Sequence, residues 1–202
     1  MKKKKFIFIV AMATLVCCAF IFSSYTKNEE TYFDVGQFFI PSGHMGCAES
    51  VPIIAINTAD FTQPHSGQTC IRVEINSWAN CGRTLWAGVY WQNKENNWGN
   101  ESGENFSGKG FTKVTFWAKG HKGKEVVIFG SGGINKLQYK DSYNTRYTTE
   151  GKNVILSNQW KQYVINLTEA DLSSVIGGFF FSVEERANQD GLTFYLDDIY
   201  FE

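Results

Sequence analysis

Short segments in which apolar and polar residues alternate recur along most of the chain. In Gln68–Ser77, for example, Ile71, Val73 and Ile75 share one side of an extended backbone, and polar residues occupy the other. Such alternation is typical of antiparallel sheets that bury one face. Ten segments are predicted to be strands: Tyr32–Ile40, Val51–Asn57, Gln68–Ser77, Leu85–Gln92, Phe111–Lys119, Glu125–Gly130, Asn153–Leu156, Gln159–Leu167, Ile176–Glu184 and Leu192–Phe201.

Helical periodicity is scarce. The only helical candidate is Glu169–Val175, with Thr168 as its N-cap, and its two turns suit a connector rather than a layer. Aromatic residues make up 16% of the chain, and turn residues separate the predicted strands. This pattern predicts an all-β fold, a two-sheet antiparallel β-sandwich, and we find no boundary that would divide residues 32–202.

The N-terminal residues differ from the rest of the chain. Lys2–Lys5 precede the apolar stretch Phe6–Phe22, which only Thr14 interrupts, and the polar segment Tyr25–Thr31 follows. A basic run before an apolar run is typical of an export signal. We therefore expect residues 1–24 to be a signal peptide or an anchor, and residues 25–31 to be a linker.

Three fates of this segment are compatible with the sequence. It is either cleaved, or retained as a membrane helix of roughly 25 Å, or replaced by a lipid at Cys17 or Cys18. Each fate predicts an exported protein, located in the cell envelope, on the outer surface or in the medium. We expect contact with a membrane only through these residues.

Charge and cysteines narrow the possible partners. Without Lys2–Lys5 the formal net charge changes from −1 to −5, and no basic stripe is left. This balance argues against nucleic acid as a partner, and we expect a monomer. Among the remaining cysteines, Cys70 and Cys81 are closer in sequence to each other than either is to Cys47, although buried free thiols are equally compatible.

Aromatic residues are concentrated between residues 86 and 98. The segment Trp86–Trp91 leads into the polar loop Asn93–Lys109, which contains Trp98. A tryptophan in such a loop either folds back as a lid on the core or presents its ring to a ligand. Sugar rings pack their C–H faces on aromatic rings, and polar side chains bind their hydroxyl groups. Trp117 and Trp160, on regular strands, are expected in the core.

We therefore predict a ligand site with Trp98 as its platform. Alternation allows only one of Tyr90 and Trp91 to face a ligand, and the loop Gly130–Tyr147 is expected to contribute as well. The complete predicted set is Trp98, Tyr90, Trp91, Asn97, Tyr139, Asp141, Tyr143 and Arg146.

Sequence signals for catalysis are weak. The chain has three histidines and lacks both HExxH and GxSxG. A glycosidase needs two carboxyl groups facing one cleft. Four glutamates are available for this role, but a solvated surface explains them equally well, and we expect no enzymatic activity: Glu101, Glu104, Glu184 and Glu185.

Asp197 and Asp198 adjoin each other inside the apolar final strand. Alternation directs one of them inward, where a carboxylate needs a counter-charge or a cation. Calcium is a suitable cation outside cells. Alternatively, both acids reach water or cap a loop at a twisted strand end.

Five blocks of sequence carry a resemblance to a known group of domains. They are Pro41–Gly46, His65–Ile71, Trp86–Gly99, Phe116–Gly120 and Phe194–Phe201. Their order resembles that in the galactose-binding-like jelly-roll domains of carbohydrate-binding modules, over nearly all of residues 32–202.

The resemblance implies a jelly roll that binds a polysaccharide or another glycan without catalysis. It also implies a structural calcium held by Asp197 with oxygens of the turn around Ser66 and Gln68. Cys47 departs from the pattern, which has an acid there. The alternative function is a cell-surface structural or protein-interaction domain that has no sugar site.

Overall fold

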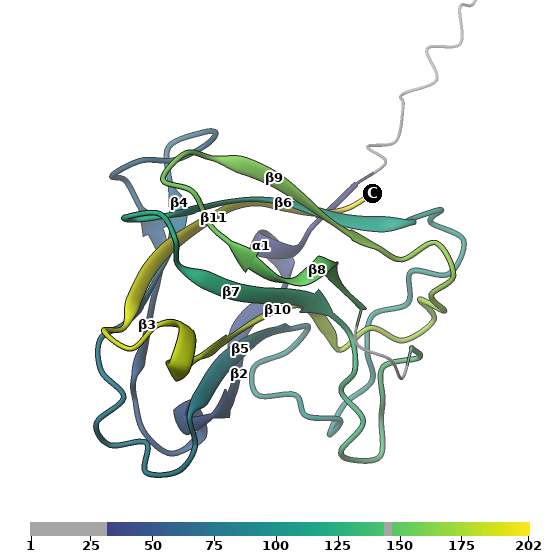
Figure 1. The fold of residues 1–202 in the computed structure, drawn as a ribbon. Coiled ribbons are helices and arrows are strands. Elements are labelled where there is room, and N and C mark those ends of the chain that lie inside the picture. Colours follow the sequence, from purple (N-terminus) through teal and green to yellow (C-terminus); the bar gives the residue numbers. More distant parts are fainter. Residues whose placement is uncertain (1–31, 144–146) are drawn as a thin grey trace, which may run out of the picture.

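Two antiparallel sheets face each other in the computed structural model, which describes residues 32–143 and 147–202 (Figure 1). One sheet has the order β3-β4-β11-β6-β9, and β1 pairs with the end of β11. Its strands are β1 (Phe33–Asp34), β3 (Ile54–Asp60), β4 (Cys70–Ile75), β6 (Lys113–Gly120), β9 (Lys161–Asn166) and β11 (Leu192–Phe201).

The second sheet has five strands in the order β2-β5-β10-β7-β8. These strands are β2 (Ile40–Gly46), β5 (Trp86–Gln92), β7 (Val126–Ser131), β8 (Tyr147–Ile155) and β10 (Gly177–Glu184). Because most strands that follow each other along the chain belong to different sheets, the connecting loops gather at the ends of the sandwich. The predicted two-sheet antiparallel β-sandwich is confirmed, and its connectivity is that of a jelly roll.

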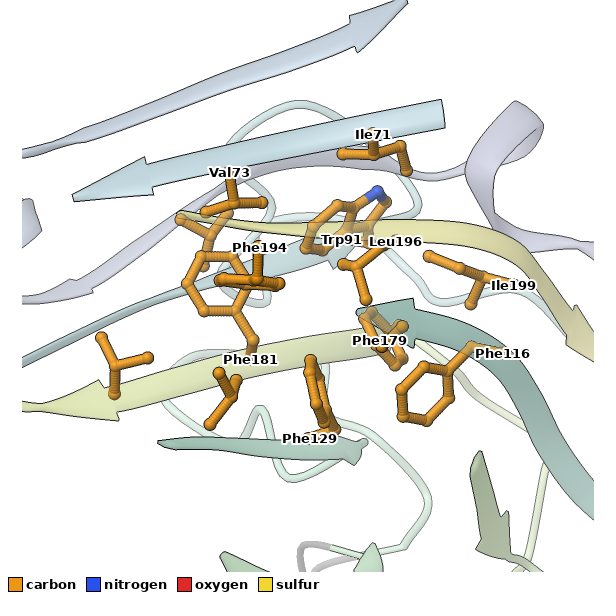
Figure 2. Close-up of a cluster of buried hydrophobic side chains, with 14 of the residues drawn as sticks. Ile71, Val73, Trp91, Phe116, Phe129, Phe179, Phe181, Phe194, Leu196 and Ile199 are labelled. Carbon is orange, nitrogen blue, oxygen red and sulfur yellow. The ribbon is translucent and has the colours of Figure 1, made fainter. Parts of the chain in front are cut away.

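The core fills the space between the sheets. Figure 2 shows Ile71, Val73, Phe194 and Leu196 of the first sheet facing aromatic side chains of the second. The alternation predicted for β4 is confirmed, because Ile71, Val73 and Ile75 are all buried. The opposing layer is mainly aromatic, and its fully buried members are Trp91, Phe129, Phe179 and Phe181.

Helices are short in the described residues. The helix α1 (Val35–Phe38) begins after Asp34, whose Oδ1 accepts a hydrogen bond from the N–H of Gln37 at 3.0 Å. It interrupts the predicted strand Tyr32–Ile40. Two single 3₁₀ turns follow, η1 (Cys47–Glu49) and η2 (Glu185–Ala187). No helix within residues 32–143 and 147–202 has both the length and the apolar character needed to span a bilayer.

The predicted helix Glu169–Val175 is wrong. Its backbone is bound to other loops instead: the carbonyl of Leu172 accepts the N–H of Phe106 at 2.9 Å, and Val175 exchanges hydrogen bonds with Glu104. A segment of two turns has little helical stability of its own, so these tertiary bonds determine its conformation.

Of the cysteines in the described residues, the two nearest in sequence, Cys70 and Cys81, are not paired with each other. A disulfide joins Cys47 to Cys81, with the Cα atoms 5.3 Å apart, and Cys70 is a buried free thiol. Cys47 follows β2 and Cys81 precedes β5, and these two strands are paired. Strand pairing therefore brings the two half-cystines together although 34 residues separate them in sequence.

Trp117 and Trp160 lie half-buried on the outer face of the six-stranded sheet, so their predicted place in the core is wrong. The loop between β3 and β4 folds over them. The ring of His65 stacks on Trp117 with centroids 3.7 Å apart, and the indole N–H of Trp160 donates to the carbonyl of Gln63 at 3.1 Å.

Candidate functional site

The outer face of the five-stranded sheet carries a second, smaller apolar cluster. Tyr90 of β5 and Phe180 of β10 are paired across the strands, and their rings lie 4.9 Å apart. Met45, Ile134 and Ile176 complete the buried part of the cluster, and half-buried Trp98 packs on it. One part of this sheet face is therefore closed by the two long loops, and Trp98 lies where the closed part ends.

The loop that follows β5 holds Trp98 in place. Its indole meets the ring of Tyr90 edge to face, with centroids 5.9 Å apart. Asn97, which is buried, braces the loop from within: its Nδ2 donates to the carbonyl of Glu101 at 3.0 Å, and its Oδ1 accepts the N–H of Gly99 at 3.0 Å. Asn97 therefore positions Trp98, and its side-chain amide is fully used inside the protein.

A groove of about 510 Å³ opens beside the exposed part of Trp98. The ammonium group of Lys136 lies 4.2 Å from the centroid of the indole. The groove combines one aromatic surface with exposed donors and acceptors, and its lining is Ser42, His44, Ala48, Glu49, Asn96, Trp98, Lys136 and Leu137. Such a mixture suits a ligand with both C–H faces and hydroxyl groups.

Neither Tyr90 nor Trp91 is accessible at the surface, although the sequence prediction had one of them facing a ligand. Trp91 points into the core between the sheets, as Figure 2 shows, and is 0% exposed. Tyr90 points to the outer face, but Trp98 and the loop after β7 cover it, and its hydroxyl donates to the carbonyl of Gly132 at 2.9 Å. Alternation assigns opposite faces to the two rings, as expected, and packing buries both.

Asp141 is likewise buried. Its carboxylate accepts hydrogen bonds from the N–H groups of Ile134 (2.7 Å), Ile176 (2.5 Å) and Gly177 (3.2 Å). Burial outweighs these bonds and raises the pKa of Asp141 to about 6. Asp141 therefore fastens the loop after β7 to the start of β10 and is not available to a ligand at the surface.

Tyr143 has the same role. Its hydroxyl and that of Ser131 are 2.9 Å apart within a hydrogen bond, and burial raises the pKa of Tyr143 well above its usual value. Tyr139 is exposed, and its N–H donates to the carbonyl of Gly99 at 3.0 Å, so it lies beside the Trp98 loop. Arg146 lies outside the described residues. Of the predicted set, the described structure leaves Trp98 and Tyr139 accessible.

An exposed tryptophan on the same face was missed by the sequence prediction. Trp86, Gly88 and Tyr90 share the outer face of β5, and Trp86 is 39% exposed at the start of that strand. It lies in a shallow pocket of about 430 Å³ with Arg83, Leu85, Glu184 and Arg186. The signal was available, because the alternation that turns Tyr90 outward also turns Trp86 outward.

One cross-strand row of residues lies between Trp86 and Tyr90 on the outer face. Gly88 of β5 is paired with Ser182 of β10, and the half-buried Ser182 is the only side chain of that pair. Gly46, next to the turn η1, lies against the Trp86 ring, because a Cβ at Gly46 would come within 2.9 Å of it. On its other side Gly88 is paired with Met45 of β2, which covers it, because a Cβ at Gly88 would lie 3.0 Å from the Cε of Met45. The outer face therefore has an aromatic group at each end, with Met45 and Ser182 between them.

Asp197 and Asp198 have a different environment from the predicted calcium site. Asp197 Oδ2 accepts the N–H groups of His65 (2.8 Å) and Ser66 (3.2 Å), and its Oδ1 accepts the N–H of Asp198. Burial raises the pKa of Asp197, although these N–H groups oppose the shift. The carboxylate is thus surrounded by donors, as in the loop-capping alternative.

Asp198 is also bonded to donors. Its Oδ2 lies 2.7 Å from Nδ1 of His65, and its Oδ1 accepts the hydroxyl of Ser66 at 2.6 Å. Gln68 is exposed. Within residues 32–143 and 147–202, no three His, Cys, Asp or Glu side chains gather as potential metal ligands. Calcium stays a prediction, and this arrangement of donors does not fit it.

The four glutamates considered for catalysis lie in separate surroundings. Glu101 pairs with Lys94, and Glu184 pairs with Arg186 at 2.5 Å. Glu104 forms a backbone bridge to Val175, whereas Glu185 begins η2. Of the four, Glu184 is the one that lines the pocket beside Trp86.

Comparison with known proteins identifies the fold. No protein-family model matches the sequence, and no curated protein matches it either. A family 30 carbohydrate-binding module matches with a TM-score of 0.51 and 17% identity, over 80% of this chain and 82% of that module. The family 30 module of a cellulosomal cellulase of Clostridium thermocellum matches with a TM-score of 0.52 and 18% identity, over 81% of this chain and 92% of the module.

A third similar structure contains a ligand. It is the family 11 carbohydrate-binding module of Clostridium thermocellum in complex with a β-1,3-1,4-mixed-linked tetrasaccharide. It matches with a TM-score of 0.50 and 10% identity, over 84% of this chain and 93% of that module. At these identities the similarity concerns the fold, and the chain has the jelly-roll β-sandwich fold of carbohydrate-binding modules.

Proposed function

We propose that this domain binds carbohydrate without catalysing a reaction, at the outer face of the five-stranded sheet, with Trp98 as the stacking platform. The observation that carries the proposal is the half-buried indole of Trp98, braced by Tyr90 and Asn97, beside a groove of polar side chains. A rigid ring that is already ordered loses little conformational entropy when it binds.

The chemistry of the groove supports a sugar. A pyranose ring would pack its C–H face on the indole in place of the Lys136 ammonium group, which lies 4.2 Å from the ring centroid. Its hydroxyl groups would bind Glu49, His44 and Asn96 at the rim. One stacked ring contributes on the order of 1–2 kcal/mol, which corresponds to about tenfold in affinity. The carbohydrate-binding modules with this fold add support for carbohydrate binding in general. The tetrasaccharide bound by one of them does not identify the ligand of this domain.

Absence of catalysis is part of the proposal. Glu184 is neutralised by Arg186, and the described structure places no other of the four candidate glutamates in the pocket beside Trp86. Two facing carboxyl groups are what glycoside hydrolysis needs. A binding role requires no such pair.

We also propose that the protein acts outside the cytoplasm. The basic and apolar residues 1–24 support export, and they lie outside the described residues. The disulfide between Cys47 and Cys81 adds support, because disulfides persist mainly in oxidising compartments. A mature protein that begins between about Cys17 and Asn28, isolated from the envelope or medium, is the expected result.

A second candidate is a structural or protein-interaction domain of the cell surface. The observation that favours it is the closed part of the sheet face, where Tyr90 and Phe180 are only 1% and 2% exposed. These rings are the central aromatic groups of the face, and in this structure they contact protein rather than solvent.

A glycan array probed with residues 26–202 distinguishes the two candidates. Binding to one class of glycan, followed by calorimetric titration with a soluble member of that class, is the expected outcome. Absence of binding to every glycan, with a normal thermal melt, would contradict carbohydrate binding and favour the second candidate.

A further inference from the structure

The pocket around Trp86 differs in charge from the groove beside Trp98. Lys136 and Glu49 both line the Trp98 groove, so its charges balance. The Trp86 pocket contains Arg83, Arg186 and Glu184. Arg186 Nε lies 2.5 Å from Glu184 Oε2, whereas Arg83 forms no ion pair with any described residue. One guanidinium therefore remains without a carboxylate beside an exposed indole.

The backbone fixes Arg83 at this position. Cys81, two residues earlier, is tied to Cys47 by the disulfide, and the N–H of Thr84 donates to the carbonyl of Cys81 at 3.0 Å. On the other side, the carbonyl of Leu85 accepts the N–H of Glu185 at 3.0 Å. The short segment that carries Arg83 is held at both ends, next to the start of β5.

We infer that the glycan bound by this face carries a carboxylate, as a uronic acid does, with its ring on Trp86 and its carboxylate on Arg83. This inference rests on the proposed carbohydrate binding. A guanidinium matches a planar carboxylate in a bidentate geometry, and it remains charged at all relevant pH values. Leu85, 52% exposed, adds apolar surface beside the ring.

One glycan chain can reach both ends of the face. Trp86 and Tyr90 are four residues apart on β5, which corresponds to about 13 Å along the strand, and Trp98 packs on Tyr90. Between the two ends the chain passes over Met45, which covers Gly88, and over Ser182. The neutral part of the chain then lies beside Trp98, and the acidic sugar lies beside Trp86.

The test is a calorimetric titration with polygalacturonate, with its fully methyl-esterified form and with dextran sulfate, at two salt concentrations. Wild type is expected to bind the free acid about tenfold more tightly than the ester, because the ester lacks the charge-assisted hydrogen bond. The Arg83→Gln variant should lose this preference. Lys109→Gln, which removes an equal charge from an exposed position in the Asn93–Lys109 loop, should keep it.

Each result has a separate meaning. Equal affinity of wild type for acid and ester would overturn the carboxylate inference and leave carbohydrate binding intact. An equal loss of the preference for the free acid in Arg83→Gln and Lys109→Gln would also overturn it. So would tighter binding of dextran sulfate than of polygalacturonate. Either result would indicate nonspecific electrostatic attraction of polyanions. Absence of binding to all three polymers and to every array glycan would contradict the proposed function, carbohydrate binding, and not only the carboxylate inference. A thermal melt of each variant checks that it is folded.

Discussion

The indole of Trp98 meets the ring of Tyr90 at an interplanar angle of 86°, and the remainder of Trp98 borders the groove. The same side chain therefore belongs to both the apolar cluster and the candidate site. Substitutions can separate its contribution to glycan affinity from its contribution to the stability of the fold.

Replacing Trp98 with alanine is expected to reduce glycan affinity roughly tenfold and to lower the free energy of unfolding by about 1–2 kcal/mol, since both stacking and packing are lost. Trp98→Phe should retain most of the stability. Trp160→Ala, which removes another half-buried indole on the other sheet, is the matched control. Unchanged affinity in Trp98→Ala, measured by calorimetry, would contradict the platform role.

Asp141 makes stability depend on pH. Its pKa of about 6 in the folded state exceeds the value of about 3.9 in an unfolded chain, so the folded protein retains the proton to higher pH. The stabilisation that protonated Asp141 gives the folded state is complete below about pH 4 and is lost as the pH rises through about 6. The loss amounts to about 3 kcal/mol.

Urea unfolding of wild type and Asp141→Asn between pH 4 and 8 checks this expectation. The difference between the two isolates Asp141 from other carboxyl groups, such as Asp60, whose pKa is lowered by its hydrogen bonds to Thr62. Wild type should lose more stability than the variant as the pH rises. Parallel curves would show that Asp141 does not titrate in this range.

The disulfide should stabilise the domain by about 3–4 kcal/mol, because closing a loop of 34 residues restricts the unfolded chain. Reduction of the disulfide, or the double substitution Cys47→Ser with Cys81→Ser, is expected to lower the urea concentration at the midpoint of unfolding. Cys70→Ala should respond to reductant as wild type does, since Cys70 is not bonded. A midpoint that reductant leaves unchanged would show that the disulfide does not form in the isolated protein.

Asp197 is expected to stabilise the domain through hydrogen bonds. Asp197→Asn should lower the melting temperature, because an amide cannot accept all three N–H groups that the carboxylate accepts. Chelation with EDTA should leave the melting temperature of wild type unchanged. A fall on chelation that calcium reverses would instead establish the metal site predicted from the sequence.

The sequence predicted the sandwich because the alternation over β4 survives in the folded protein, where Ile71, Val73 and Ile75 are buried. It misassigned short segments whose conformation depends on distant partners. Glu169–Val175 has the composition of a helix, but its backbone bonds to Phe106 and Glu104 appear only in the folded chain. The pairing of Cys47 with Cys81 follows from the pairing of β2 with β5, which spacing along the chain does not reveal.

The candidate site was predicted in part. An aromatic residue in a polar loop identified Trp98, and composition alone also selected Asp141 and Tyr143. Those two side chains are polar and lie in a long loop, yet they bind the loop to Ser131 of β7 and to Gly177 of β10. Whether a polar loop residue faces outward or inward depends on the N–H groups that surround it, and these belong to other segments of the chain.

Glycines underlie the closed part of the sheet face. A Cβ at Gly130 would lie 2.4 Å from the ring of Phe180, and one at Gly177 would lie 2.8 Å from the ring of Tyr90. The two rings and the glycines beneath them can therefore change only together. In evolution this half of the face would diverge slowly as a block, whereas Arg83 and Lys136, whose side chains are exposed, can change singly. Related domains should then differ in their ligands mainly at the two ends of the face.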